Sequence, residues 1–119
     1  MAKSVLAERT KEFARDVVFM CQGIRNRKQD IILTNQLLKS GTSIGANVHE
    51  ANYAHSKADF VSKRQIALKE CYETEYWLDL LFDTEYIGEA EYKKMRENCG
   101  SIRRMLVASC ITVKENTSS

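Results

Sequence analysis

The sequence predicts an all-α protein, an antiparallel up-down-up-down four-helix bundle that forms a single domain over residues 1–119. Two observations predict this fold. The 119 residues include no proline, although an average protein of this length has about six, so folds that depend on many tight turns are disfavoured. Apolar residues also recur at helical spacing along nearly the whole chain. The length suits one domain.

The first two helices are expected over about residues 4–25 and 30–53, joined by the polar stretch 26–29. The apolar stripe of the first is Leu6, Phe13, Val17, Met20, Cys21 and Ile24. The main stripe of the second is Leu33, Leu37, Ile44, Val48 and Ala51. About 115° away around the second helix lies another row, Ile31, Leu38 and Gly45. Small residues between these rows predict close approach of a neighbouring backbone.

The last two helices are expected over about residues 57–85 and 89–115. Ser56 and Asp59 predict a capping box at the start of the third helix. Its main stripe is Phe60, Ala67, Cys71, Leu78 and Phe82, and a second row is Ile66, Glu70, Glu73, Trp77 and Leu80. The fourth helix has a continuous seam of Tyr92, Met95, Cys99, Ile102, Leu106, Ser109 and Val113, which is suited to antiparallel packing.

The additional apolar rows are more than a monomeric bundle needs, because a large side chain such as Trp77 would remain exposed. We therefore expect a homo-oligomer. The residues expected at its interface belong to the second rows of the second and third helices and are Ile31, Leu38, Gly45, Ile66, Trp77 and Leu80.

Charge is distributed unevenly although the net charge is only +2. Residues 1–28 have seven cations and three acids, whereas residues 55–87 have four cations and seven acids. The net charge is too small to identify a nucleic-acid-binding protein. A cationic patch that contacts phosphates is nevertheless one interpretation, and a solvated surface that complements the helix dipoles is the other. The candidate nucleic-acid contacts are Arg25, Arg27, Lys28, Arg103 and Arg104.

The four cysteines are widely spaced and form no C-x-x-C pair. The chain begins without the apolar segment of a signal peptide, and no apolar run approaches the length that spans a bilayer. We expect reduced thiols that pack as small apolar groups, a cytoplasmic location and no membrane association.

No combination of residues predicts catalysis or a metal site. The sequence His49-Glu50 begins like a zincin motif, but position 53 is tyrosine and H-E-x-x-H is not completed. The chain has neither the Glu-x-x-His pairs of di-metal bundles nor the Gly-x-Ser-x-Gly turn of serine hydrolases. We expect no catalytic residue, no metal and no cofactor.

Three polar residues flank the expected core stripes: Asn47 on the second helix, and Arg64 and Glu75 on the third. A buried charge requires a partner or a hydrogen bond. Pairing between helices is one interpretation, and a ligand-binding site is the other.

Residues 36–51 read Gln-Leu-Leu-Lys-Ser-Gly-Thr-Ser-Ile-Gly-Ala-Asn-Val-His-Glu-Ala. This block resembles the signature of the bacterial four-helix-bundle family first noticed in intervening sequences of large-subunit ribosomal RNA genes. The family typically shows Gln-Leu, a basic residue, Ser-Ile, Ala-Asn, an aliphatic residue and Glu-Ala or Glu-Gly. The blocks Ser-Lys-Ala-Asp-Phe at 56–60 and Ile-Ala-Leu-Lys-Glu-Cys-Tyr-Glu-Thr-Glu-Tyr-Trp-Leu at 66–78 resemble it as well.

The resemblance implies a pentamer of antiparallel four-helix bundles. The family is similar to the accessory variability proteins of diversity-generating retroelements, pentamers that bind nucleic acid and a reverse transcriptase. It supplies no catalytic residues. Its polar motif positions are interpreted as markers of the fold or of an interface, and here they are Gln36, Ser43, Asn47, Glu50, Glu70, Glu73 and Glu75. Relatives often have proline in the first connection, whereas this chain has Arg-Lys-Gln at 27–29, which predicts a loop of different shape.

We therefore expect a non-enzymatic homo-oligomer, a pentamer according to the resemblance, that binds structured RNA or a nucleic-acid complex through basic surface residues. The alternative is a structural or protein-adaptor oligomer without nucleic-acid binding, because the rows around Leu38 and Trp77 are suited to recruiting other helices. An enzyme is the third hypothesis and has the least support from the sequence.

Overall fold

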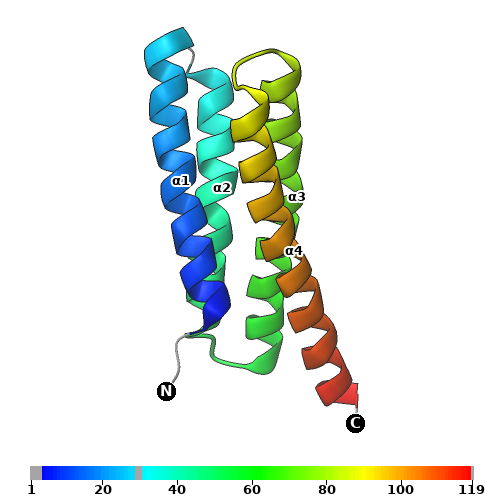
Figure 1. Ribbon diagram of the computed structural model, residues 1–119. Helices are drawn as coiled ribbons and strands as arrows, with labels where there is room; N and C mark the ends of the chain where they lie inside the picture. The colour runs from blue at the N-terminus through cyan, green and yellow to red at the C-terminus, as the bar shows by residue number, and fades with distance from the viewer. Residues whose placement is uncertain (1–3, 29–30, 119) are drawn as a thin grey trace.

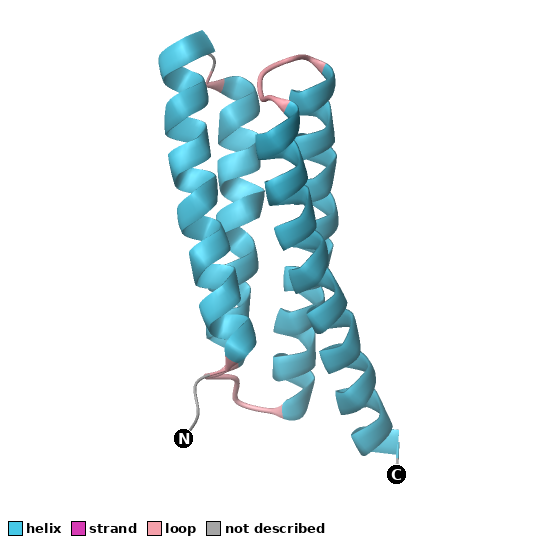
Figure 2. Cartoon of the chain, in the orientation of Figure 1, coloured by secondary structure: helices cyan, strands magenta, loops and turns pink. Residues whose placement is uncertain are grey.

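Four long helices run alternately up and down around one apolar interior (Figure 1). They are α1 (Val5–Lys28), α2 (Ile32–Ala51), α3 (Lys57–Asp83) and α4 (Glu89–Ser118). The structure, a computed structural model, describes residues 4–28 and 31–118, with side chains described up to residue 110. Within this part of the chain every regular element is a helix (Figure 2). The predicted all-α, antiparallel four-helix fold is confirmed.

Local sequence explains where the helices begin. The Ser4 hydroxyl accepts a hydrogen bond from the Ala7 amide at 3.3 Å and caps α1. The predicted cap of α3 is confirmed, since the Ser56 hydroxyl accepts from the Asp59 amide at 3.1 Å. Asp59 reaches back to the amide of His55, one residue before the cap. Acidic residues in the first turn of α4 complement the positive end of its dipole.

Two helices extend further than the sequence predicted. The predicted end of α1 at residue 25 was wrong, because the helix continues to Lys28. Its last turn is held by Arg27, which donates to the Tyr86 carbonyl at 2.9 Å, and by Lys28, whose ammonium lies 5.5 Å from the centre of the Tyr86 ring. Helix α4 continues to Ser118 rather than ending near residue 115. The predicted first connection includes Gln29, which lies outside the described residues.

The interior follows the predicted stripes on α1 and α2 closely. All six predicted core residues of α1 are buried, and on α2 only Leu33 is half-buried. On α3, Phe60 and Phe82 are half-buried, and Leu81, which lay outside the predicted stripe, is fully buried. The α4 seam is buried from Met95 to Leu106, with half-buried residues at both ends, and the side chain of Val113 lies outside the described part. The four cysteines are free and buried, as expected for thiols that pack as apolar groups.

The small residues of α2 permit close contact with α1. A Cβ atom on Gly41 would lie 2.9 Å from a methyl group of Val17, and one on Gly45 would lie 3.2 Å from the carbonyl oxygen of Thr10. The predicted close backbone approach is confirmed. Helix α4 packs along α3 but leans away from α1 toward its C-terminal end (Figures 1 and 2). The N-terminus of α1 and the C-terminus of α4 lie at this open end of the bundle.

Candidate functional site

Most polar motif residues lie together along the outer edge between α2 and α3. We call this surface the α2/α3 face and define it by Gln36, Ser43, Asn47, Glu50, Ile66, Glu70, Glu73, Trp77 and Leu80. On each helix its members are separated by three, four or seven residues, which keeps them on one side.

Contacts between the two helices fix how this face is aligned. The Ser40 and Thr74 hydroxyls are buried and hydrogen-bonded at 3.0 Å. Nearer the other end, Lys63 pairs with Glu50 at 2.9 Å. Because the helices are antiparallel, this alignment places Ser43 level with Glu70 and Gln36 level with Trp77. The family-motif residues from two separate parts of the sequence therefore form one surface.

Polar groups on the α2/α3 face bond mainly to one another. Asn47 donates to the Ser43 carbonyl at 2.8 Å and to the Ser43 hydroxyl at 3.0 Å, so it bonds within α2. The predicted pairing between helices was therefore wrong for Asn47. The Trp77 indole N–H donates to Glu73 at 3.4 Å while its ring packs against the core.

Glu70 is the carboxylate of this face with a shifted pKa. Partial burial and the neighbouring Glu73 charge raise its pKa, although Lys39 and Lys69 oppose the shift. A half-buried carboxylate beside a second carboxylate is an incompletely neutralised site. It would gain from a hydrogen-bond donor or a cation supplied by another molecule.

Glu75 is the motif residue that lies elsewhere. It is buried on the opposite edge of α3, where it pairs with Arg96 at 2.9 Å and with Arg103 at 3.0 Å, both from α4. Arg96 also pairs with Asp79 at 2.9 Å. The predicted pairing between helices is confirmed for Glu75, which is a structural residue of the α3–α4 contact.

The other expected interface residues lie on the opposite edge of α2. Ile31 is 59% exposed, Leu38 is half-buried against the core, and Gly45 faces Thr10 of α1. A groove of about 900 Å³ follows this edge, and we call it the α1/α2 groove. Its lining consists largely of small residues, including Ala7, Thr10, Ala14, Thr42, Gly45 and Ala46, with His49 and Tyr53 toward one end. The six expected interface residues therefore lie on two opposite edges of α2 and α3, and of the three on this edge Gly45 lines the groove.

The five candidate nucleic-acid contacts also divide into two groups. Arg25, Arg27 and Lys28 lie at the C-terminal end of α1, and we call this group the basic end. Arg25 donates to the Thr34 hydroxyl at 3.0 Å and to the Asn35 side chain. Arg103 and Arg104 lie about 20 Å along the bundle axis from the start of α4. Because Arg103 pairs with Glu75, only Arg104 of this second group is exposed.

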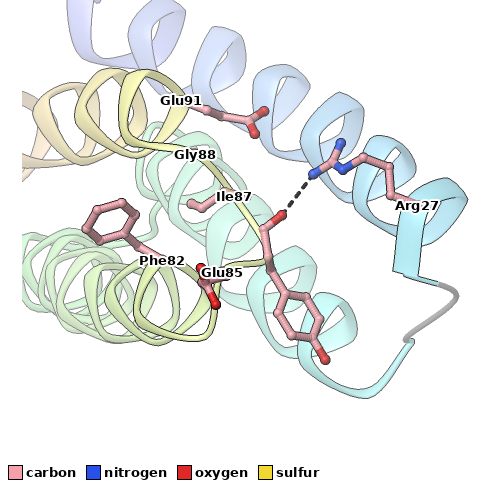
Figure 3. Close-up of a pocket in the computed structure, with 7 residues that line it drawn as sticks. Arg27, Phe82, Glu85, Ile87, Gly88 and Glu91 are labelled. Atoms are coloured by element: carbon pink, nitrogen blue, oxygen red, sulfur yellow. Dashed lines mark hydrogen bonds between the residues drawn. The ribbon is translucent and has the colours of Figure 1, made fainter.

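A cavity of about 680 Å³ adjoins the basic end (Figure 3). Arg27 enters from α1 and donates to the Tyr86 carbonyl, as the dashed line shows. The carboxylates of Glu85 and Glu91 line the same cavity. Cationic and anionic groups are therefore mixed here, and the surface is not uniformly attractive to phosphate.

Arg64 is paired between helices, as one of the two interpretations expected, and its partner is a hydroxyl group of α4. It is 8% exposed, and its Nη1 donates to the Ser109 hydroxyl of α4 at 2.6 Å. The ring of Phe60 lies 4.7 Å from its guanidinium carbon. The sequence signal was present, since Phe60, Arg64, Ala67 and Cys71 follow the helical spacing of the core.

Several residues of these networks were not identified from the sequence. They are Lys63, which pairs with Glu50 of the α2/α3 face, and Asp79 and Arg96 between α3 and α4. Tyr92 was expected as a seam residue, but not as a donor, together with Arg96, to Asp79. The four-residue spacing of Tyr92 and Arg96 places them on one side of α4, but their shared acceptor belongs to another helix.

Among the described residues, no group of three or more His, Cys, Asp or Glu side chains is arranged to hold a metal ion. The His49 ring instead lies 5.2 Å from the Tyr53 ring. Burial raises the pKa of the Cys21 thiol to about 11, although Arg25 opposes the shift, so the thiol stays protonated near neutral pH. No helix in the described ranges has both the length and the apolar character required to cross a membrane.

Comparison with known proteins agrees with the resemblance seen at residues 36–51, 56–60 and 66–78. No curated protein sequence matches the chain. The crystal structure of a protein of unknown function from the S23 ribosomal protein family of Bacteroides thetaiotaomicron VPI-5482 is similar, with a TM-score of 0.88 and 42% sequence identity. The match covers 89% of this chain and 98% of that one. The family model for the 23S rRNA-intervening sequence protein matches residues 3–108, and the chain therefore belongs to this family.

Proposed function

We propose that the protein is a non-enzymatic homo-oligomer in which the α2/α3 face of one copy packs against the α1/α2 groove of the next. The observation that carries this proposal is the apolar content of the α2/α3 face. Ile66 is 40% exposed and shares its helix side with the half-buried Trp77. Tyr76, 60% exposed, lies edge-on to Trp77 with ring centres 5.0 Å apart. Burying these groups against another copy would remove apolar area from water.

Polar groups on the face support the same function. Glu70 and Glu73 would gain donors at a contact, and the Lys63–Glu50 pair lies at one end of the face. On α3 the two carboxylates lie between Ile66 and Trp77, and a mixture of apolar and polar groups is usual in protein interfaces. The motif residues Gln36, Ser43 and Asn47 would then be retained for assembly rather than for chemistry.

The two proposed surfaces differ in shape and lie on opposite edges of α2. Gly45 of the groove and Asn47 of the face are two residues apart, which is about 200° around a helix. Contact between two different patches is heterologous, and it generates a ring when the rotation between copies closes. The pentamer implied by the family resemblance is an assembly of this kind.

Substitution of exposed apolar residues tests the assembly. Ile66→Glu on the α2/α3 face and Ala46→Trp in the α1/α2 groove are each expected to lower the mass measured by light scattering toward the 13.6 kDa of one chain. Phe19→Glu is the matched control, because Phe19 is 62% exposed on α1 and belongs to neither surface. Circular dichroism checks that each variant remains helical. If the Ile66→Glu protein keeps the mass of the wild type, the α2/α3 face is not the interface.

Binding of structured RNA is a second candidate function, favoured by the basic end. Arg27 and Lys28 are exposed and are both held at Tyr86, so their charges lie close together in a fixed position. The names of the family and of the similar structure refer to ribosomal RNA and to a ribosomal protein family. The carboxylates of Glu85 and Glu91 oppose this function, which is why self-association has more support.

A titration at two salt concentrations tests RNA binding. The double variant Arg27→Ala/Lys28→Ala is expected to bind a structured RNA several-fold more weakly than the wild type. The slope of log affinity against log salt concentration should also be shallower for the variant. The expected reduction of this slope is about 0.7–0.9 for each phosphate that the variant no longer neutralises. Lys93→Ala/Lys94→Ala removes two adjacent cations from α4 and is the control. Absence of salt-sensitive binding by the wild type at low ionic strength would exclude this function.

A further inference from the structure

A buried cation without an acidic partner lies at the open end of the bundle. Among the described residues, no carboxylate forms an ion pair with Arg64, and its Nε is buried without a hydrogen-bond acceptor. Ser109 occupies only Nη1 of the guanidinium. A buried charge that is incompletely satisfied is costly, and an anion placed beside it would recover that cost.

Arg64 lines a shallow apolar groove between three helices. The groove has a volume of about 500 Å³ and is lined by residues of α1, α3 and α4. Its walls are mainly apolar and consist of Val5, Leu6, Phe60, Met105 and Ala108, together with Ser4 and Ser109. A ligand there would meet one buried cation and an otherwise apolar surface.

A second positive element faces the same groove. Residues 4–6 line the groove and form the N-terminus of α1. Ser4 already accepts from the Ala7 amide, and the amides of Val5 and Leu6 have no acceptor within the helix. A helix N-terminus favours an anion through these amides and through the helix dipole. Burial lowers the pKa of Arg64, but an arginine side chain remains charged in proteins. Two features of the groove lining, Arg64 and the N-terminus of α1, therefore favour negative charge.

We propose that this groove is a binding site for a small amphiphilic carboxylate, with the head group at Arg64 and the apolar chain along Val5, Phe60 and Met105. The guanidinium suits a carboxylate, because arginine forms strong charge-assisted hydrogen bonds with carboxylate oxygens. The apolar walls suit a hydrocarbon chain and provide no further polar partner for a more highly charged head group. The site shares Ser4 with the lining of the α1/α2 groove but contains no residue of the α2/α3 face or the basic end, and a local signal at the site tests it independently of the mass of the assembly.

Titration with decanoate tests the site in the full-length protein. Methyl-labelled methionine gives a local signal, because Met105 lines the groove whereas Met95 is buried elsewhere in the core. Decanoate is expected to shift the Met105 methyl resonance and to bind at least tenfold more tightly than acetate or decanol. The proposal would be overturned by a Kd for decanoate above about 1 mM. It would also be overturned if acetate or decanol bound as tightly as decanoate, or if the Met105 methyl resonance did not shift.

Two variants assign the head group to Arg64. Arg64→Met keeps an unbranched apolar stem at this position without the charge and is expected to weaken decanoate binding at least tenfold. Ser109→Asp supplies an internal carboxylate beside Arg64 and is expected to block binding while raising the unfolding temperature. If Arg64→Met fails to fold, Ser109→Asp carries the test. Arg104→Met, which removes an exposed cation of α4, is the control and should bind like the wild type. Wild-type affinity in either of the first two variants would contradict the assignment.

Discussion

Arg103 of α4 donates from Nε to the buried carboxylate of Glu75 on α3 at 3.0 Å. The same Glu75 oxygen lies 2.9 Å from Nη1 of Arg96, which in turn pairs with Asp79. Two residues of α4 seven positions apart therefore meet one carboxylate of α3. This network fixes the axial alignment of the two helices and explains why a charged residue is buried at position 75.

Removing the Glu75 carboxylate should destabilise the bundle. Glu75→Gln leaves Arg103 without its ion pair, and we expect a loss of about 1–3 kcal/mol in the free energy of unfolding, since both arginines remain partly solvated. Chemical denaturation measures this loss. Glu89→Gln, which breaks the exposed pair with Lys93, is the control and should cost less than about 0.5 kcal/mol. Equal effects of the two substitutions would show that the buried network contributes no more than a surface pair.

Close packing between α1 and α2 predicts a penalty for enlarging Gly41. A Cβ atom there would lie 2.9–3.0 Å from both methyl groups of Val17, which is fully buried and has little room to move. We expect Gly41→Ala to lower the free energy of unfolding by about 1–3 kcal/mol. Gly88→Ala is the matched control, since no atom lies within 4 Å of the added Cβ. A Gly41→Ala protein as stable as the Gly88→Ala protein would mean that α1 separates from α2 at little cost.

The turn that ends α3 predicts a stabilising substitution. Glu85 has a φ of 64°, and the flanking bonds run from the Tyr86 amide to the Leu81 carbonyl at 2.8 Å and from the Glu85 amide to the Phe82 carbonyl at 3.0 Å. This is a Schellman motif with glutamate in the position that favours glycine. Glu85→Gly should therefore raise the free energy of unfolding by about 0.5–1 kcal/mol.

Gln65→Gly is the control, because it places glycine at an exposed position inside α3, where it should destabilise by about 0.5–1 kcal/mol. The opposite signs of the two substitutions, measured by thermal or chemical denaturation, test the left-handed conformation of Glu85. A loss of stability in both variants would contradict it.

The α2/α3 face predicts a pH-dependent effect at Glu70. Its pKa is raised in the folded protein, so the folded state binds this proton more readily than the unfolded state does. The carboxyl therefore favours folding below its ordinary pKa of 4.5, and this contribution is lost as pH rises through the higher pKa of the folded state. At pH 7 Glu70→Gln should be more stable than the wild type, and the difference should shrink below pH 4.5. A difference independent of pH would show that the ionised carboxylate is not the cause.

Helical periodicity was sufficient to predict most of the buried residues, and the pair Ser56 and Asp59 was sufficient to predict the cap of α3. Val17, Ile44 and Leu106 are fully buried because each occupies the centre of its stripe. On α3 a single stripe was too narrow, since this helix packs against both α2 and α4. Leu81 and Glu75 are about 120° apart around the helix and mark the two edges of its buried surface.

Contacts between helices could not be predicted in the same way. The partners of Glu75 and Arg64 depend on the axial alignment of α3 and α4, which the connection at residues 84–88 and the packing determine together. Nor does the sequence signal the turn at Glu85, because glycine is absent from that position. Periodicity shows which side of a helix faces inward, whereas alignment along the axis decides which residues form the α2/α3 face.

The mass of the wild-type protein in solution tests the central proposal most directly. Size-exclusion chromatography with multi-angle light scattering, over a range of protein concentrations, measures it without any substitution. Self-association through the α2/α3 face predicts a mass that is a whole-number multiple of 13.6 kDa, five times that value for the ring that the family resemblance implies. A mass of 13.6 kDa at every concentration would contradict the proposal.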